Sequence, residues 1–457
     1  MNGFPRWFAR VSRVVCAGIF ILGALSVRIL CQEGPPRRVL EQARYGDVVF
    51  VDAAVLPSDS ALFERIDVMV RIAKDFIVFT RSGVLQRDSS YVGGMEISIE
   101  IQDPKGGAVA STHDKTRIFT GSYESTNTRD EFLNYRKTFY LSSDTYTIKV
   151  ILNDVGSTRE RIIPVQVKLR SLDAPEPVIG SVIPLAPSAL SDPLKLPVEI
   201  LGFGNSVMYS RPAYVAVTSS DSSRGEWRFI LQKTIDQEER KVVSDTVLEP
   251  LATYNHATLS ADNGFSVTNS IIANPAARGY VHLFRLPYDT LFAGRYQLYV
   301  RVADGGMKDT LTVPLRVYWK DMPFSMRDMA FAASVMRYIE TEDEMKAMDG
   351  ASQQRREELF QQFWKKRDPT PGTALNERMT EYFRRADVAE TRFQTLFNRH
   401  GALSDRGKIY ILYGEPDDVR HTMQPDEPPA EIWVYRDLNQ SFRFADRDRN
   451  GNMRLAQ

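Results

Sequence analysis

The side chains of "MEISIEIQ", residues 95–102, alternate strictly between apolar and polar. Successive side chains of a β-strand point to opposite faces of its sheet, so this period of two predicts a strand with one buried face. Further strands are expected at 47–53, 68–79 and 146–152, with turn-rich sequence between them. Several short strands without intervening helices predict an antiparallel β-sandwich. The buried side chains of the first strand would be Met95, Ile97, Ile99 and Ile101.

An internal repeat extends this prediction. The stretch "YTIKVILNDVGSTRERIIPVQVKL", residues 146–169, aligns without a gap with "YQLYVRVADGGMKDTLTVPLRVYW", residues 296–319. Each copy has the pattern of a strand, an Asp-x-Gly turn and a returning strand. The simplest interpretation is two tandem sandwiches of immunoglobulin-like design, although hairpins that reuse the same turn residues are an alternative.

The chain is too long for one ordinary hydrophobic core, because it has 457 residues. We expect a β-sandwich domain at 38–172, a second one at 173–320 and a C-terminal domain at 321–457. Residues 171–197 contain six prolines. Proline removes backbone donors and favours extended conformations, so this segment is expected to be a linker or the irregular first edge of the second domain.

Charge and histidine spacing exclude several classes of function. Lys+Arg and Asp+Glu both number 58, so no overall field favours nucleic acid. The five histidines are scattered, without the spacing of a zinc site. The motif Gly202-Phe203-Gly204 lacks the other residues of a phosphate loop and is interpreted as a bend between strands. No cofactor is indicated.

Residues 1–31 have the pattern of a signal peptide. Three arginines precede the apolar run 14–27, which has the length of a signal-peptide core. We expect cleavage, and therefore a protein that is periplasmic, on the cell surface or secreted, with no membrane span in the mature chain. A retained anchor is disfavoured because Arg28 interrupts the run, and lipidation of Cys31 because no small residue precedes it.

After Trp319 the apolar period becomes helical. Helices are expected at 352–367 and 374–400, with Gly401 as a left-handed stop for the second. Ser325-x-x-Asp328 and Thr341-x-x-Glu344 have the spacing of capping boxes. Short strands are expected at 408–413, 431–435 and 441–445, which completes an α+β module.

This C-terminal region resembles a known family. The stretches "FWKKRDPTPGTALNERMTEYFRRADVAETRF", "GALSDRGKIYILYGEPDDV", "EIWVY" and "FRFADRDRNGNMRL" are similar to the GWxTD domain of secreted bacterial proteins, over about residues 324–457. The motif itself is degenerate here, Gly401-Ala402-Leu403-Ser404-Asp405, with alanine where the family has tryptophan. The resemblance implies a signal peptide and β-rich regions upstream, but no established reaction.

Two corners of this region carry candidate functional residues. Asp405 and Arg406 precede the expected strand 408–413, and Tyr413 and Asp417 follow it. The carboxylates could act as acid and base or bind a polar ligand. The favoured interpretation is structural, in which Asp405 caps the chain, Arg406 pairs with a carboxylate and the residues around Asp417 form a turn.

Three further sets of residues also have both a functional and a structural interpretation. Asp368 and Glu377 could be a carboxylate pair, as in glycosidases, or parts of a rigid joint between helices. Trp433 could belong to an aromatic binding face or to a core. Asp446, Asp448 and Asn450 repeat the start of a calcium loop that lacks its final glutamate, so an Asn-Gly turn is favoured.

For each candidate residue, a structural role is favoured over a catalytic role. We therefore expect a non-catalytic binding or assembly role in the cell envelope, with a protein or glycan partner. One alternative is a hydrolase of an envelope polymer that uses the carboxylates named above. Another is a subunit of an outer-membrane or secretion machine.

Overall fold

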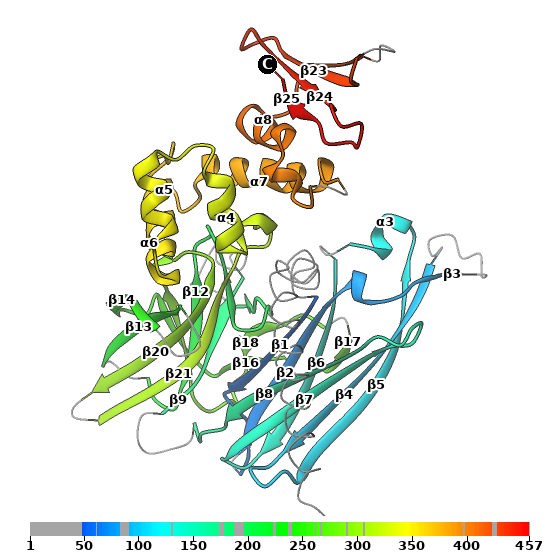
Figure 1. Ribbon diagram of the computed structural model, residues 1–457. Helices are drawn as coiled ribbons and strands as arrows, with labels where there is room; N and C mark the ends of the chain where they lie inside the picture. The colour runs from blue at the N-terminus through cyan, green and yellow to red at the C-terminus, as the bar shows by residue number, and fades with distance from the viewer. Residues whose placement is uncertain are drawn as a thin grey trace, which may run out of the picture. The chain divides into compact units, whose positions relative to one another are not determined.

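The computed structural model describes residues 48–456, except 61, 83–90, 129–130, 173–177, 187–195, 223–224, 236–239, 261, 266, 289–290, 305–306, 396–397 and 423–426. The expected signal peptide, residues 1–31, lies outside the described residues. Strands dominate the described chain up to Tyr318, and most of its helices follow (Figure 1).

The first strands form two sheets that pack face to face. Sheet I has the order β1-β2-β6-β17, and sheet II has the order β3-β4-β7-β8 with β5 also paired to β4. Sheet I consists of β1 Val49–Leu56, β2 Glu64–Ala73, β6 Phe132–Leu141 and β17 Gly264–Phe265. Sheet II consists of β3 Thr80–Arg81, β4 Tyr91–Gln102, β5 Ala108–Thr120, β7 Thr145–Asp154 and β8 Glu160–Lys168. A 3-10 turn, Lys74–Phe76, and a short helix, α3 Tyr123–Thr126, complete this region.

The structure confirms the buried face that the alternating sequence predicts for strand β4. The four apolar side chains predicted to be buried are each 0% exposed and share one core with β1, β2, β6 and β7. Strand β2 differs from the prediction, because it ends at Ala73 and the 3-10 turn follows. The expected strand 68–79 was therefore too long, since its apolar residues Phe76 and Ile77 are buried in the turn region instead.

A second pair of sheets follows. Sheet III has the order β15-β19-β12-β9, and sheet IV has the order β11-β21-β20-β13-β14. Sheet III consists of β9 Ile179–Leu185, β12 Tyr214–Ser219, β15 Ala252–Asn255 and β19 Tyr280–Arg285. Sheet IV consists of β11 Ser206–Met208, β13 Glu226–Thr234, β14 Arg240–Leu248, β20 Gly294–Asp304 and β21 Met307–Tyr318. A small sheet contains β10 Val198–Glu199, β16 Ala257–Leu259 and β18 Ser270–Ala273.

Both copies of the internal repeat are antiparallel hairpins. The first copy is β7 paired with β8, and the second is β20 paired with β21. Within the proline-rich segment 171–197, the structure describes a strand, β9 Ile179–Leu185. Every residue of β9 within it is buried, and β9 pairs with β12 at the edge of sheet III. Apolar burial of "IGSVIPL" therefore outweighs the prolines around it.

The outer faces of sheets I and III share a further core. Ala54, Leu56 and Met69 of sheet I pack with Ile183, Leu185, Val281 and Leu283 of sheet III and with the small sheet. Polar contacts cross the same boundary, since the Val55 amide donates to Ser181 Oγ at 2.6 Å and Thr218 Oγ1 donates to the Val55 carbonyl at 3.0 Å. The first and second β-regions are thus joined by a buried core.

A buried charge cluster fixes part of the second region to sheet I. Arg65, Asp67 and Arg136 are 4%, 0% and 0% exposed. The Arg65 guanidinium donates to both oxygens of Asp67, at 2.7 and 3.1 Å. Arg136 donates to the carbonyls of Ser260 and Thr268, at 3.0 and 3.3 Å, and to that of Asp262. These bonds hold the stretch that carries β17 against β6.

Sheet III contains a buried histidine, His282, that is 0% exposed. Ser219 Oγ donates to the Asp221 carbonyl at 2.6 Å and so accepts from His282 Nε2 at 2.8 Å. Thr253 Oγ1 lies 3.0 Å from Nδ1 and can donate to it. These contacts suit a neutral ring, and burial lowers the pKa of His282 to about 4 from its ordinary 6.5.

Because His282 is buried, we expect the stability of the fold to decrease in acid. Between pH 6.5 and 4 the unfolded chain binds a proton that the folded chain excludes, so stability present above pH 6.5 is lost as the pH falls towards 4. We expect His282 to account for about 3 kcal/mol of that loss. Urea unfolding at several pH values should show a shallower pH dependence for His282→Gln than for the wild type. An equal dependence in both would contradict this assignment, and the exposed His113→Gln is the control.

The C-terminal module contains helices followed by a sheet. The helices are α4 Met329–Met336, α5 Glu342–Asp349, α6 Gln353–Lys365, α7 Glu377–Arg392 and α8 Asp405–Tyr413, with 3-10 turns Phe324–Met326 and Gly401–Leu403. The sheet is β22 Asp418–Thr422, β23 Ala430–Tyr435, β24 Gln440–Ala445 and β25 Arg454–Leu455, paired in that order. Among the described residues, no helix is long and apolar enough to span a membrane.

Local signals in this module are confirmed at some positions and wrong at others. Thr341 and Glu344 form the expected capping box of α5. Ser325 does not cap a helix, because it is buried in a 3-10 turn and Asp328 itself caps α4. Helix α7 ends at Arg392, so Gly401 is not its left-handed stop. The expected strand 408–413 is helix α8.

Candidate functional site

The degenerate motif Gly401-Ala402-Leu403-Ser404-Asp405 builds the beginning of α8. Ser404 Oγ accepts the amide of Gly407 at 3.0 Å, which is the bond of a helix N-cap. Asp405 occupies the first turn, and its Oδ2 accepts the Leu455 amide of β25 at 2.7 Å. Gly414, with φ of 85°, ends the helix. The cap explains why this apolar run is a helix and not a strand.

Close backbone packing surrounds this cap. A Cβ atom on Gly401 would lie 2.7 Å from the Glu390 carbonyl oxygen, and one on Gly407 would lie 2.8 Å from that of Ala402. Ala402 is 0% exposed, and its amide donates to the buried Glu390 carboxylate at 3.1 Å. The other oxygen of Glu390 lies 3.0 Å from His400 Nδ1. The motif therefore joins the end of α7 to the start of α8.

The remaining corner residues also have partners within the fold. Arg406 contacts Glu431 at 3.3 Å, and Glu431 accepts from Trp433 Nε1 at 3.3 Å. Trp433 is 2% exposed and belongs to the helix-and-sheet core. Tyr413 is 37% exposed and stacks on Phe442 with ring centroids 5.2 Å apart. These side chains therefore contribute to packing and ion pairing within the module.

The candidate carboxylates hold local backbone and side-chain groups. Asp417 Oδ2 accepts the amide of Arg436 at 2.7 Å. Asp368 Oδ1 accepts the Thr370 amide at 2.9 Å, and the Thr370 hydroxyl donates to Glu377. That hydroxyl bond lowers the pKa of the exposed Glu377 carboxyl. Asp368 and Glu377 are thus linked through Thr370 in the joint between α6 and α7.

The calcium-like segment is a turn held by one aspartate. Asp446 Oδ1 accepts the amide of Asn450 at 3.0 Å, and its Oδ2 accepts that of Gly451 at 2.7 Å. Asn450 Oδ1 in turn accepts the Asn452 amide at 3.0 Å. No cluster of three or more His, Cys, Asp or Glu residues that could hold a metal occurs in the described part of the chain. Asp448 does not join Asp446 in such a cluster.

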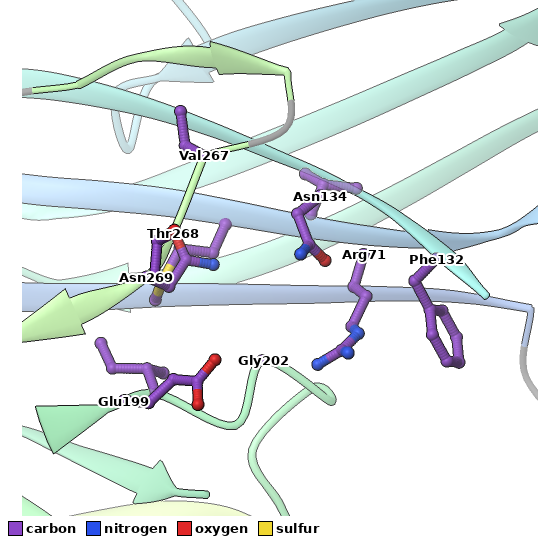
Figure 2. Close-up of a pocket in the computed structure, with 11 residues that line it drawn as sticks. Arg71, Phe132, Asn134, Glu199, Gly202, Val267, Thr268 and Asn269 are labelled. Atoms are coloured by element: carbon purple, nitrogen blue, oxygen red, sulfur yellow. The ribbon is translucent and has the colours of Figure 1, made fainter. Parts of the chain in front are cut away.

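A polar cavity of about 270 Å³ lies between sheet I and the small sheet (Figure 2). Glu199 and Thr268 are exposed and mark its mouth, whereas Met69 and Ile200 are buried. In Figure 2 the polar ends of Arg71, Asn134 and Glu199 come from different strands and turn towards one space. The lining is Met69, Val70, Arg71, Phe132, Asn134, Glu199, Ile200, Gly202, Val267, Thr268 and Asn269.

Arg71 is held rigidly in this cavity. Its guanidinium carbon lies 4.6 Å from the ring centroid of Phe132 and 4.2 Å from that of Phe203. One nitrogen, Nη1, donates to the Leu201 carbonyl at 2.8 Å. Burial lowers the pKa of Arg71, partly opposed by Glu199 and Asp52, and the group stays protonated. The centroids of these two rings are 5.3 Å apart, so the rings do not cover opposite faces of the guanidinium group.

Two buried polar atoms of the lining lack a hydrogen-bond partner among the described residues. They are the donor Nε of Arg71 and the acceptor Oδ1 of Asn269. A buried group without a partner costs about 1–3 kcal/mol. The backbone around them is fixed, since the Ile200 amide donates to the Asn269 carbonyl at 2.7 Å and Arg136 holds the neighbouring Thr268 carbonyl.

The bend at Gly202-Phe203-Gly204 shapes one wall, as a bend between β10 and β11. Gly202 and Gly204 both have φ of 66°, in the left-handed region that glycine tolerates best. Asp52 is buried and accepts the amides of Gly204 and Asn205, at 2.9 and 2.5 Å. Burial raises the pKa of Asp52, and these two amides oppose the shift. The bend places Phe203 against Arg71.

Sequence reasoning missed this cavity. Its residues come from four separate stretches, 69–71, 132–134, 199–202 and 267–269. One usable signal was present, namely Arg71 within the otherwise apolar run "VMVRIA", because arginine is seldom buried without a specific partner. The lining contains no histidine or cysteine and a single carboxylate, Glu199. Its chemistry suits binding of a polar group better than acid–base catalysis.

Comparisons with known proteins bear on the C-terminal region. Residues 298–454 match the GWxTD domain. A search of curated protein sequences finds no match. The family match agrees with the resemblance seen in the sequence and begins earlier, within β20.

Among solved structures, 33 chains match. One is described as the complete structure of manganese lipoxygenase of Gaeumannomyces graminis and partial structure of zonadhesin of Komagataella pastoris, with 11% identity, TM-score 0.14, and coverage of 58% of this chain and 93% of that chain. Another is an endo-fucoidan hydrolase from glycoside hydrolase family 107, with 9% identity, TM-score 0.13, and coverage of 62% and 46%. Scores this low do not indicate a shared fold.

Proposed function

We propose that this chain, which carries a GWxTD domain over residues 298–454, is an exported cell-envelope protein with a non-catalytic binding role. Its binding site is the cavity around Arg71, and its partner is a glycan or protein of the envelope. Export rests on the signal-peptide pattern of residues 1–31. The two pairs of facing sheets are immunoglobulin-like sandwiches in this proposal, which is a common design for binding and spacing domains.

One observation carries the proposal. The cavity is lined by the polar side chains of Arg71, Asn134 and Glu199, which come from three different strands and turn towards one space (Figure 2). Arg71 is already oriented by Leu201 and two aromatic rings, so little conformational entropy of this side chain would be lost on binding. The candidate carboxylates of the C-terminal module, in contrast, each accept a hydrogen bond within the fold.

Substitution of Arg71 should weaken binding to envelope material without unfolding the chain. Arg71→Lys keeps the charge but removes the planar edge that carries Nε, so we expect about a tenfold loss of affinity. Co-sedimentation of the mature protein with insoluble envelope polymer, titrated to saturation, measures this change. Arg228→Lys on β13 is the control, because that arginine is exposed and does not line the cavity.

A second variant separates binding from folding. Arg71 packs on Phe132 and Phe203, so its substitution also touches an aromatic cluster, whereas Asn269→Ala does not. Both variants should bind weakly and melt as cooperatively as the wild type. Binding that is unchanged in both variants would overturn the proposed site. Release of soluble fragments from the polymer that stops in Asp417→Asn or Glu377→Gln would favour the hydrolase instead.

A further inference from the structure

We infer that the corner between α4 and α5 is a pH-sensitive latch, which the neutral carboxyl group of Glu340 holds closed and which opens when that group loses its proton. The corner is the segment 337–341, from the C-cap of α4 to the N-cap of α5. This inference concerns the C-terminal module and is independent of the Arg71 cavity. It follows from the buried position of the carboxyl group and from the ion pairs around it.

Both carboxyl oxygens of Glu340 are buried and lack a hydrogen-bond partner among the described residues. The backbone holds this residue in place, because its amide donates to the Met336 carbonyl at 3.1 Å. Glu340 does not cap α5, since that role belongs to Thr341, whose Oγ1 accepts the Glu344 amide at 3.3 Å. A buried carboxylate without partners is much more costly than a neutral carboxyl group. The folded corner therefore favours the protonated form of Glu340.

Four charged side chains act on Glu340 from the elements around it. Two are cations, Arg337 at the end of α4 and Arg367 just after α6, and each already has a carboxylate partner. Arg337 donates to Asp349 at 2.7 Å, and Arg367 donates to both oxygens of Glu344 at 3.2 Å. These two pairs fasten α5 to its neighbours. An ionised Glu340 could take either cation only by weakening one of them.

The sign of the pH effect follows from the raised pKa of this carboxyl group. Burial is the main cause that raises the pKa of Glu340 to about 7 from its ordinary 4.5, the two neighbouring carboxylates add to the rise, and the two arginines oppose it. Stability from such a group is fully present below pH 4.5 and is lost as the pH rises towards 7. The latch is therefore closed in mild acid and loosened above about pH 7.

Hydrogen bonds connect the corner to the degenerate motif and to α7. The Tyr338 hydroxyl, within the corner, donates to the Ala402 carbonyl at 3.0 Å. The Tyr382 hydroxyl on α7 donates to the Val335 carbonyl of α4 at 2.6 Å. Burial raises the pKa of Tyr382, and its neighbours Tyr338 and Glu340 add to that rise. Opening of the corner therefore also loosens the motif.

Hydrogen exchange of the purified protein at about pH 5.5 and pH 8, corrected for the intrinsic rate at each pH, tests the latch. An opening that exposes Glu340 releases close to one proton between pH 4.5 and 7, so amides of 338–345 should exchange about thirtyfold faster at the higher pH. Amides of 402–404 should rise with them, and those of β23 in the same module should change much less. A local measurement is needed because unfolding of the whole chain would include the opposite effect of His282.

Two variants remove the titrating group. Glu340→Gln keeps its shape, and Glu340→Met replaces a group without partners by an apolar chain of similar length. In both variants the corrected exchange at 338–345 should be the same at the two pH values. Glu342→Gln is the matched control, because 90% of the Glu342 side chain is exposed, and it should keep the rise of the wild type.

The outcomes separate the latch from its extension to the motif. A wild type without the rise at 338–345 would overturn the inference, and so would Glu340 variants that keep it. A rise at 338–345 without one at 402–404 would overturn the link to the motif and confine the latch to the corner.

Discussion

Gly407→Ala should destabilise the C-terminal module by about 3 kcal/mol or more, because the added methyl group has no space. A Cβ atom at this position overlaps the carbonyl oxygen of Gly401 and lies 2.8 Å from that of Ala402. Both neighbours are backbone atoms in the buried turn that joins α7 to α8, so neither can rotate away. Chemical denaturation followed by tryptophan fluorescence, which reports on the buried Trp364 and Trp433, measures the loss.

Gly372→Ala is the matched control for this change. Gly372 lies in the same module, in the joint between α6 and α7, and a Cβ atom there meets no atom within 4 Å. Alanine at a compatible glycine position stabilises slightly, by about 0.4–1 kcal/mol, because it restricts the unfolded chain. Similar unfolding midpoints for the Gly407 and Gly372 variants would show that the motif is not packed as described.

Asp67→Asn should cost about 3–5 kcal/mol, since it leaves two buried guanidinium groups without their carboxylate. Arg65 and Arg136 are 4% and 0% exposed, and Asp67 accepts from Arg65 at 2.7 Å and from Thr138 Oγ1 at 2.6 Å. The change keeps the shape of the side chain and removes only its charge. Calorimetric or denaturant unfolding of the purified protein measures the loss.

A second aspartate on the surface provides the control. Asp245 accepts from Arg228 at 2.7 and 2.8 Å, which resembles the pairing of Asp67 with Arg65. The side chains of Arg228 and Asp245 are 46% and 37% exposed. Exposed ion pairs contribute little to stability, so Asp245→Asn should unfold almost as the wild type does. Equal effects of the two substitutions would mean that the buried cluster contributes no more to stability than an exposed ion pair does.

Sequence patterns predicted the parts of this fold that depend on local chemistry. Alternation placed the buried face of β4, and the repeat placed the hairpins β7–β8 and β20–β21, because the period of a strand is visible in neighbouring residues. Helix α8 was not predicted, because a short apolar run does not distinguish a helix from a strand. Ser404 acts as the N-cap of this helix, but its hydroxyl reaches the Gly407 amide only in the folded chain.

The candidate site was less accessible to prediction. Asp405 and Asp417 stand out in the sequence because they are polar and near glycines, yet both accept backbone amides from distant strands or turns. Arg71 and Asn269 are 198 positions apart and line one cavity only because the stretch that carries β17 folds back onto β6. No local pattern encodes such an arrangement, so Arg71 within the apolar run of β2 was the one clue in the sequence.

Hydrogen exchange, followed by mass spectrometry with and without the envelope polymer, tests the Arg71 cavity as the binding site most directly. A ligand in that cavity reduces local opening of the backbone around it. We predict slower exchange at 199–204 and 267–269 when the polymer is bound, and unchanged exchange at 405–417. Slower exchange confined to 405–417 would contradict the account and return the function to the GWxTD domain.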